Sequence, residues 1–436
     1  MSEDETEAAG AVLELGPFDR HGITRARLVD EEGGPARIVE VEHGIPDETV
    51  RVAISGHKRL HGKILEVLEP APDRVEAPCP YFREWSCGGC QWQMIAYEGQ
   101  VARKRAEVEA AMEAVGLDLI VERTHTLADP WRYRSTAGIA LGKRAGFRRR
   151  ASLAIVPIRD CPISHPLIGR LMAELNDRLD AGTLPDFRGR VRLDARLAEG
   201  AEGEYLQVLI RVEEGRPDPA ALAALGETLA GLGFVGSVLH EDGDDLKVLA
   251  GDSFGTIEVA GRQVVVTPGA FFQTNLRLLP ELIERIVAEA RPLGGMRVAD
   301  VYGGVGLFGL FLAGEAGEVV VFETEPMAVA AGERTAALWG VENVRFIGGE
   351  AEDTFYGAGP FDVAVVDPPR SGLSEGVLEA LTGMEPPVVL YVSCLAESLA
   401  RDLAVLAEAG YRVHGLELFD FYPQTYHVEM LAVLRR

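Results

Sequence analysis

The sequence predicts a multidomain fold, in which a small N-terminal β-barrel and a central α+β domain precede a C-terminal doubly wound, Rossmann-like α/β domain. Short segments of alternating polar and apolar residues, separated by turn residues, fill residues 11–70. Residues 120–260 continue in short strands and turns. From about residue 265, apolar strands alternate with helical stretches, and a glycine-rich loop follows the first strand.

The composition limits the class of protein. The 436 residues include 68 Asp and Glu against 43 Lys and Arg, which gives a formal net charge of −25. This length suggests roughly two to four domains, and disorder, collagen and a disulfide scaffold are excluded. No apolar run reaches the ~18 residues of a membrane helix, and the acidic start of the chain lacks the features of a secretion signal. We expect a cytoplasmic monomer without a membrane partner.

The N-terminal half divides into three predicted parts. Residues 1–10 form an acidic tail that we expect to be disordered, and residues 11–70 form the antiparallel barrel. A proline-containing linker follows, and the central domain is expected to span residues 75–262. It includes a predicted helix at 95–115, rich in Ala and Glu, which we expect to pack on the C-terminal domain.

Four cysteines form a candidate metal site. Cys79, Cys87 and Cys90 lie close together in the sequence, and Cys161 follows far downstream, beside a proline. Disulfides are disfavoured in the cytosol, whereas zinc and iron–sulfur clusters both accept four thiolates. Three close ligands and a distant fourth favour the cluster. The spacing does not match the C-x3-C-x2-C run expected of a radical S-adenosylmethionine enzyme.

The C-terminal domain, residues 263–436, begins with a predicted amphipathic helix at 276–290, capped by Thr274 or Asn275. The next strand leads into a G-x-G-x-x-G loop, in which glycines permit a tight turn and close approach to a ligand. Glu323 ends the following strand, where a carboxylate can accept hydrogen bonds from a ribose diol. Nicotinamide and S-adenosylmethionine enzymes both have these features, so the two cofactors stay open at this point.

Three further residues are candidates for catalysis. Asp367 begins Asp-Pro-Pro-Arg directly after a buried strand, and Cys394 ends another strand of the same sheet. A cysteine in this position is a candidate nucleophile or a small buried apolar residue. Glu429 is a carboxylate near the chain end. It is a candidate catalytic residue only if it lies beside Asp367 and Cys394.

At these residues the chain resembles the RNA 5-methyluridine methyltransferase family, over nearly its whole length. Residues 11–70 are similar to the OB-like TRAM domain, and Phe147–Arg150 lies where the family carries a basic strand. Phe271-Phe-Gln-Thr-Asn275, the loop at Tyr302, Asp367-Pro-Pro-Arg370, Ser393-Cys394 and His427-Val-Glu429 follow in the family's order.

The resemblance implies roles for these residues. Cys79, Cys87, Cys90 and Cys161 would hold a 4Fe-4S cluster. The cofactor and base pocket would be lined by Gln273, Tyr302, Glu323 and Asp367, with Cys394 as nucleophile and Glu429 as general base. The cofactor would be S-adenosylmethionine, and the partner RNA, with rRNA favoured over tRNA.

The chain departs from the family pattern in four places. Seven residues separate Cys79 from Cys87, where the family usually has five. Gly303 stands where Cys is common, and Leu395-Ala396 replaces a frequent Asn-Pro. Leu307 occupies a position where some members have a polar cofactor contact.

The implied chemistry explains the residue types. Uracil C5 is a poor nucleophile, so addition of the Cys394 thiolate to C6 would create an enolate that attacks the methyl group. Glu429 would then remove the C5 proton, and β-elimination would free the cysteine. The target uridine should be flipped out or single-stranded. The rival hypotheses are an iron–sulfur RNA-binding protein without methylation activity, a nicotinamide oxidoreductase, and a methyltransferase acting on an exocyclic nitrogen.

The net charge initially argues against a nucleic acid partner, because phosphate backbones favour positive surfaces. Two local clusters reverse this inference: residues 143–150 and residues 57–63 are both rich in Arg, Lys or His. We therefore expect a strongly bipolar surface, and an affinity for RNA that falls steeply with salt.

Overall fold

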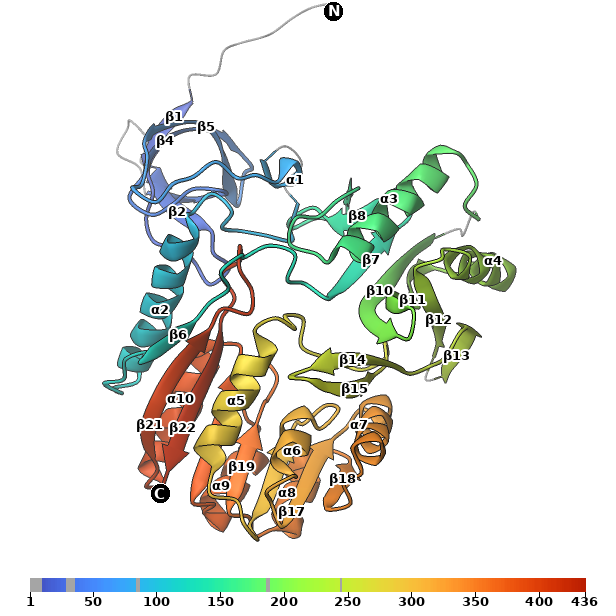
Figure 1. Cartoon of the computed structure of the whole chain (residues 1–436). Helices are drawn as coiled ribbons and strands as arrows, with labels where there is room; N and C mark the ends of the chain where they lie inside the picture. The colour runs from blue at the N-terminus through green and yellow to red at the C-terminus, as the bar shows by residue number, and fades with distance from the viewer. Residues whose placement is uncertain (1–9, 29–35, 84–86, 186–188, 244) are drawn as a thin grey trace, which may run out of the picture. The chain divides into compact units, whose positions relative to one another are not determined.

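The computed structural model describes residues 10–28, 36–83, 87–185, 189–243 and 245–436 (Figure 1). The predicted acidic tail lies outside this part, except for Gly10. The chain divides into two compact units. The first comprises Met1–Arg103, Arg149–Ser152 and Pro423–Tyr426, and the second comprises Lys104–Arg148, Leu153–Tyr422 and His427–Arg436.

A sheet of five strands, counted over the described residues, forms most of the first unit. Its order is β1-β4-β5-β3-β2. The strands are β1 (Ala11–Glu14), β2 (Thr24–Leu28), β3 (Arg37–Val41), β4 (Thr49–Ser55) and β5 (Leu60–Glu69). Alternate apolar side chains, such as Val39, Val41, Val50 and Val52, are buried in its core, so the strands predicted from alternation are confirmed. The prediction of an all-antiparallel sheet is wrong, because β3 and β5 pair in parallel.

Two helices follow the barrel. They are α1 (Pro80–Arg83) and α2 (Tyr97–Ala114), so the helix predicted at 95–115 is confirmed. Gly116 has a φ of +80°, a left-handed conformation that suits glycine after a helix. In the part of α2 that belongs to the second unit, Val108 and Met112 are completely buried and join the core of the C-terminal sheet.

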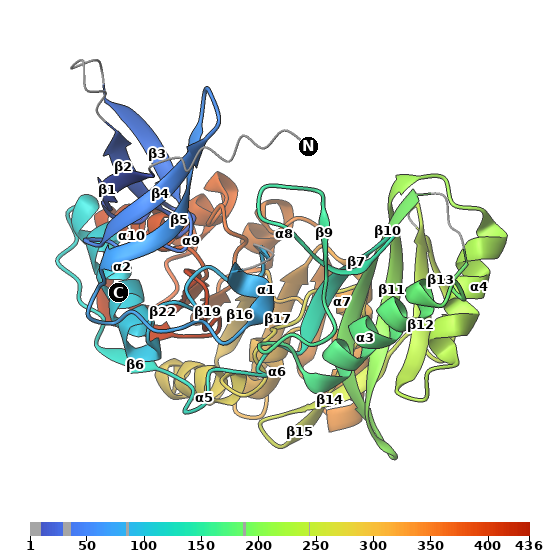
Figure 2. The same ribbon diagram turned by 90° about the horizontal axis from the view of Figure 1, so that it is seen from above.

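The central sheet of the second unit contains nine strands over the described residues. They are β7 (Thr136–Leu141), β8 (Ala145–Arg148), β9 (Ile155–Pro157), β10 (Gly189–Gly200), β11 (Gly203–Gly215), β12 (Val235–Asp242), β13 (Asp245–Ala250), β14 (Gly255–Val259) and β15 (Arg262–Val266). The main path runs β13-β12-β11-β10-β7-β8-β9, and β14 joins β10 to β15. Helices α3 (Pro166–Asp180) and α4 (Pro219–Ala230) lie beside this sheet (Figure 2).

The C-terminal sheet has the order β18-β17-β16-β19-β20-β22-β21-β6 in the part that the structure describes. Its strands are β6 (Arg123–His125), β16 (Arg297–Val301), β17 (Glu318–Glu323), β18 (Val344–Gly348), β19 (Val363–Val366), β20 (Val388–Ser393), β21 (Arg412–Phe419) and β22 (Glu429–Arg435). Strands β16–β20 are parallel, and β22 runs antiparallel to both of its neighbours. The predicted doubly wound α/β fold is confirmed.

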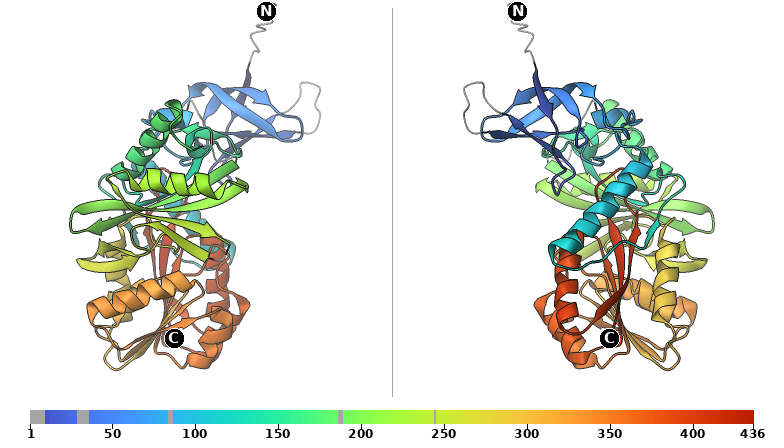
Figure 3. Two further views of the ribbon diagram at one scale, coloured as in Figure 1. Left: turned by 90° about the vertical axis from the view of Figure 1, so that its right-hand side faces the viewer. Right: turned by 90° about the vertical axis from the view of Figure 1, so that its left-hand side faces the viewer.

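Helices cover both faces of this sheet (Figures 1 and 3). One face carries α5 (Leu279–Ala290), α6 (Leu307–Leu312) and α7 (Pro326–Trp339), and the other carries α8 (Ala351–Ala358), α9 (Glu375–Met384) and α10 (Ala396–Glu408). Strands β16, β17, β19 and β20 between them are mostly apolar and buried, as expected of a sheet covered on both sides, whereas the edge strand β18 is partly exposed. Among the described helices, none is both long and apolar enough to cross a membrane.

Helix α5 begins at Leu279, three residues later than predicted, and its N-cap position is Leu278 rather than Thr274 or Asn275. Pro280 explains the difference: it lacks a backbone N–H and fits only in the first turn of a helix. Asn275 has another role, because its Oδ1 accepts a hydrogen bond of 3.2 Å from the Leu278 amide ahead of the helix.

Candidate active site

The three candidate catalytic residues, all in the second unit, lie at one edge of the C-terminal sheet. Asp367 follows β19 and Cys394 follows β20, so both lie at carboxyl ends of parallel strands. Glu429 begins the antiparallel strand β22 and therefore lies at the same edge. In open α/β sheets this edge is where ligands bind.

Strand register places Cys394 opposite Glu429. Ser393 pairs with Met430 across β20 and β22, so the next residues toward the edge are Cys394 and Glu429. Cys394 is partly exposed, whereas Glu429 is 2% exposed. Cys394 is therefore half-buried and has a buried carboxylate across from it.

The surroundings of Cys394 keep its thiol protonated in the free protein. Burial, followed by the negative charges of Glu429 and Asp367, raises the pKa of Cys394 to about 12, and Arg370 opposes this rise. A thiolate, the nucleophilic form, requires that the nearby negative charge be reduced.

Three carboxyl groups influence one another at this edge. Burial raises the pKa of Asp300 to about 7, although one of its oxygens accepts a hydrogen bond of 2.8 Å from the Gly309 amide. Burial and the neighbouring Asp300 raise the pKa of Asp367 to about 7. Burial and Asp367 raise the pKa of Glu429 well above its usual value. Such shifts cluster at functional sites.

The glycine loop between β16 and α6 is tied to Glu323. The Gly304 amide donates a 2.8 Å hydrogen bond to Oε2 of Glu323, while the amides of Thr324 and Glu325 donate to Oε1 at 2.8 Å each. Tyr302 has a φ of +61°, an uncommon conformation for a non-glycine residue. Glu323 therefore lies beside the turn that follows β16, and Tyr302 belongs to that turn.

Gln273 lies in a loop that is held by hydrogen bonds from two other segments of the second unit. The Arg196 guanidinium donates to the carbonyls of Thr267 and Ala270, and the Ser135 amide donates to the carbonyl of Thr274 at 2.8 Å. Gln273 is 5% exposed, and its Oε1 has no hydrogen-bond partner among the described residues. A buried acceptor without a partner is costly, and a bound ligand can satisfy it.

The loop before Glu429 contains residues that sequence reasoning missed. The Tyr422 hydroxyl hydrogen-bonds Glu429, and the Lys104 Nζ donates to Asp420 at 2.6 Å and to the Tyr422 carbonyl at 3.0 Å. Asp300 was also missed. The sequence contains a sign of two of these residues. Asp300 interrupts an apolar strand, and Lys104 is one of five lysines in the chain.

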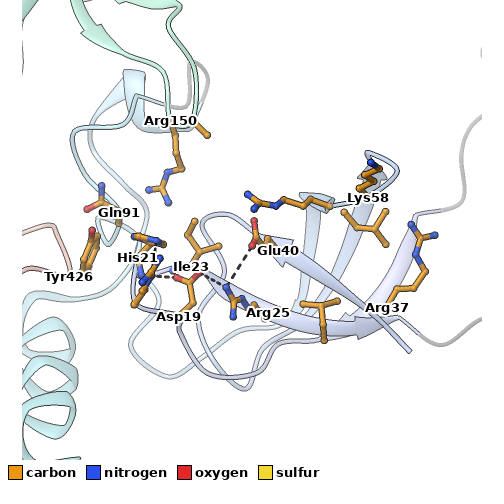
Figure 4. A pocket seen from close by; sticks show the side chains of 15 residues that line it. Asp19, His21, Ile23, Arg25, Arg37, Glu40, Lys58, Gln91, Arg150 and Tyr426 are labelled. Atoms are coloured by element: carbon orange, nitrogen blue, oxygen red, sulfur yellow. Dashed lines mark hydrogen bonds and ion pairs between the residues drawn. The ribbon is translucent and has the colours of Figure 1, made fainter. Parts of the chain in front are cut away.

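A basic groove of about 910 Å³ lies within the first unit (Figure 4). Its cationic side chains are Arg20, Arg25, Arg37, Lys58, Arg59 and Arg150, and Tyr426 adds an aromatic ring. Asp19 and Glu40 pair with Arg25 at 3.1 and 3.7 Å. For Lys58 and Arg59 the structure gives no carboxylate partner within its described ranges. The groove suits a polyanion, since cations attract phosphates and aromatic rings stack on bases.

The basic run at 143–150 does not act as one patch. Arg144 pairs with Asp180, and Arg148 pairs with Glu213. Arg149 and Arg150 belong to the first unit, whereas the residues before them belong to the second. Of this run, the basic groove includes Arg150 alone.

The four predicted metal ligands are distributed over both units. In the first unit, Cys79 and Cys90 are each 7% exposed, and the Cys87 amide donates to the Tyr81 carbonyl at 3.0 Å. Cys161 belongs to the second unit and is also 7% exposed. Over the part of the chain that the structure describes, no three His, Cys, Asp or Glu side chains gather as a metal-binding group.

Comparison with known proteins gives consistent matches. Residues 252–436 match the family described as tRNA (Uracil-5-)-methyltransferase. An uncharacterised RNA methyltransferase of Halalkalibacterium halodurans is 31% identical, with 96% of this chain and 98% of the relative covered. The 23S rRNA (uracil(1939)-C(5))-methyltransferase RlmD of Shewanella amazonensis is 30% identical, with 94% of this chain and 92% of the relative covered.

A solved structure supports the fold. The crystal structure of Pyrococcus abyssi tRNA (uracil-54, C5)-methyltransferase in complex with S-adenosyl-L-homocysteine covers 97% of this chain and 100% of its own, with a TM-score of 0.72 and 22% identity. This match shows that the two chains share a fold. The family match over residues 252–436 and the relatives that match over nearly their full length lead to one conclusion: the chain belongs to the RNA (uracil-5-)-methyltransferase family.

Proposed function

We propose that the protein transfers a methyl group from S-adenosylmethionine to C5 of a specific uridine in rRNA, through a covalent adduct between Cys394 and uracil C6. The observation that carries this proposal is the placement of Cys394 opposite Glu429, with Asp367 within electrostatic range of both. Uracil C5 methylation needs a nucleophile and a base at one site, and both are present here. The exocyclic-nitrogen alternative requires no cysteine nucleophile, and the nicotinamide alternative leaves Asp367-Pro-Pro without a role.

In the proposed reaction, Cys394 and Glu429 at the sheet edge have different roles. As the thiolate, the Cys394 sulfur adds to C6, and the electron pair of the C5–C6 double bond makes C5 nucleophilic. S-adenosylmethionine, when bound, supplies the electrophilic methyl carbon. Glu429 then accepts the C5 proton, the C5–C6 double bond re-forms, and the sulfur leaves C6 as thiolate. Glu429 acts as base only when ionised, although burial and Asp367 disfavour that form.

Tyr302, Glu323, Asp367 and Gln273 are proposed to bind the cofactor and the base. Glu323 lies at the end of the second strand, beside the glycine loop, a position suited to a ribose. The Oε1 of Gln273, buried and without a partner in the described structure, suits a donor on the ligand. These features fit S-adenosylmethionine and an RNA base.

The proposal of rRNA over tRNA rests on the RlmD relative, which acts on 23S rRNA by its name. We propose that the barrel is a TRAM domain and that its groove binds the RNA backbone, supported by the six cationic side chains of the groove. We also propose domains at 11–70, 75–262 and 263–436. Each contains most strands of one sheet, although β6 joins the C-terminal sheet and β15 crosses the second boundary.

A 4Fe-4S cluster held by Cys79, Cys87, Cys90 and Cys161 is part of the proposal. Its support is the donor chemistry, because four thiols, three of them buried, form a suitable ligand set. We assign the cluster a role in folding and no step of the reaction. Iron and sulfide analysis of anaerobically purified protein should give four of each per chain, and Cys90→Ser should lower both. Iron-free protein of unchanged thermal stability contradicts this role.

The experiment that tests the function uses two RNA transcripts made without modifications, 23S rRNA and a set of tRNAs. Each is incubated with the protein and S-adenosylmethionine, and the nucleosides are quantified by mass spectrometry. We expect 5-methyluridine in the rRNA alone. Product in tRNA alone overturns the assigned substrate, and methylation at another atom overturns the reaction.

A further inference from the structure

We propose that Tyr422 is a positioning residue for Glu429: its hydroxyl holds the carboxylate in place for removal of the C5 proton. The inference rests on the proposed function and adds a residue that the sequence analysis did not select. It concerns the second half of the reaction, after the methyl group has been transferred.

The first observation is a hydrogen bond. The Tyr422 hydroxyl donates to the Glu429 carboxylate, which is 2% exposed. A carboxylate has two oxygens, so one can be held by the hydroxyl while the other accepts a proton. Burial, and then the charge of Glu429, raises the pKa of Tyr422 well above its usual value of 10, so the hydroxyl remains a donor at working pH.

The second observation is that the backbone around Tyr422 is fixed by side chains from distant parts of the second unit. The Lys104 Nζ donates to the Tyr422 carbonyl at 3.0 Å, and the Asn275 Nδ2 donates to the Phe421 carbonyl at 3.1 Å. The Tyr422 ring also lies edge-on to His427, with 5.8 Å between centroids. These contacts hold the hydroxyl in one direction, as preorganisation requires.

The third observation is the charge around Glu429. Burial, followed by the charge of Asp367 at the end of β19, favours the protonated carboxyl of Glu429. The Tyr422 hydrogen bond works in the opposite direction and favours the ionised form. Arg370 acts on Cys394 and His427, and burial, followed by Arg370, lowers the pKa of His427 to about 4. Tyr422 is therefore the group that directly supports the basic form of Glu429.

Tyr422 assists the elimination that releases the methylated base from Cys394. In the methylated adduct, C5 carries the methyl group and a hydrogen, and C6 is bonded to the Cys394 sulfur. Glu429 takes the proton, the electron pair of the C5–H bond forms the C5–C6 double bond, and the C–S pair leaves with sulfur. Loss of the hydroxyl should slow this step and leave the preceding methyl transfer unchanged.

The test is Tyr422→Phe, examined with an unmodified 23S rRNA transcript and S-adenosylmethionine. We expect the covalent protein–RNA complex to accumulate on denaturing gels, because its breakdown becomes roughly 10- to 100-fold slower, the effect of losing a hydrogen bond to a charged group. The rate should recover toward high pH, since the pKa of Glu429 rises in the variant. Normal turnover without accumulation, and an unchanged pH profile, overturns the inference.

Two controls separate the possible failures. Glu429→Gln should trap the complex, so if neither Glu429→Gln nor wild type shows adduct or product, the proposed function has failed rather than this inference. Tyr411→Phe removes another buried hydroxyl, bonded to the Pro386 carbonyl at 2.9 Å, and should leave the breakdown rate unchanged.

A second variant keeps the test valid if Tyr422→Phe folds poorly. Replacing Tyr422 with 3-fluorotyrosine retains the ring and makes the hydroxyl a stronger donor. The pH at which breakdown becomes half-maximal should then fall. A purely structural role for Tyr422 predicts no shift, and that result contradicts the inference.

Discussion

Cys394 and Glu429 lie opposite each other at the carboxyl edge of the C-terminal sheet, because Ser393 and Met430 are cross-strand partners. Cys394 follows the end of β20, and Glu429 begins β22. Because β22 runs antiparallel to β20, the end of β20 lies beside the start of β22. The proposed nucleophile and the proposed base are thereby brought to one site by backbone pairing. The same proximity makes the Cys394 thiol harder to ionise, because the charge of Glu429 raises its pKa.

The Cys394 thiol should react slowly with iodoacetamide in the free protein. Burial, Glu429 and Asp367 raise its pKa to about 12, so at pH 8 we expect alkylation at least ~100-fold slower than for an ordinary thiol of pKa ~8.5. Glu429→Gln removes one negative charge and should accelerate the reaction about tenfold. Peptide mass spectrometry identifies the site.

Glu397→Gln is the matched control, because Glu397 lies three residues beyond Cys394 but is not among the groups that shift the thiol pKa. Alkylation of Cys394 at the rate of a free thiol in the wild-type protein contradicts this account of its environment.

Lys104→Met should strongly destabilise the protein. Both members of the Lys104–Asp420 pair are completely buried, with 2.6 Å between Nζ and Oδ1. Removing the cation leaves a buried carboxylate unpaired, which costs about 3–5 kcal/mol of unfolding free energy. Lys247→Met is the control, since its ion pair with Asp242 is 56% exposed on both sides and should contribute little to stability. Urea unfolding measures both, and equal losses contradict the prediction.

His125 should make stability depend on pH. Its Nδ1 lies 2.9 Å from Glu281 and its Nε2 lies 2.8 Å from Glu417. Burial lowers the pKa of His125, but these hydrogen bonds outweigh it, and the pKa ends above its usual 6.5. The stabilisation is therefore complete below pH 6.5 and is lost as pH rises through the raised value.

We expect His125→Gln to cost more at pH 6 than at pH 9, by on the order of 1 kcal/mol. Glu417 does not interfere, because its pKa is lowered to about 2 and its contribution is lost only as pH falls toward that value. The exposed His414 lies on the same strand, and His414→Gln serves as control. A His125→Gln cost that is equal at both pH values counts against the prediction.

RNA affinity should fall steeply with salt, and Arg59→Gln should reduce the slope of log K against log salt by about one. Arg59 lines the basic groove of the first unit. Arg144→Gln is the control: Arg144 is already paired with Asp180 and should change the slope less. Filter binding at several salt concentrations measures the slopes, and equal changes in the two variants rule out the groove as the RNA site.

Much of the C-terminal site was predictable because it depends on strand ends. Asp367 and Cys394 each follow a short apolar strand, and parallel strands place their carboxyl ends at one edge. Local alternation likewise located the barrel strands. The parallel β3–β5 pair was not predictable, because alternation specifies which face is buried and not which strands are neighbours.

The contacts that the sequence did not reveal join residues far apart in the chain. Lys104 and Asp420 are separated by 316 positions, and neither stands out as a partner of the other. The arginine run at 143–150 looked like one cationic patch, but acids from other elements neutralise Arg144 and Arg148. Tyr422 has no local motif, and its importance comes only from the hydrogen bond to Glu429.

The most direct test of the covalent mechanism uses a 23S rRNA transcript containing 5-fluorouridine. Fluorine at C5 cannot be removed as a proton by Glu429, so the methylated adduct cannot break down. We predict a stable protein–RNA complex that requires S-adenosylmethionine, maps to the peptide containing Cys394 after nuclease and protease digestion, and is absent from Cys394→Ala. Failure of the wild-type protein to form this complex, or methylation of normal RNA by Cys394→Ala, contradicts the central claim.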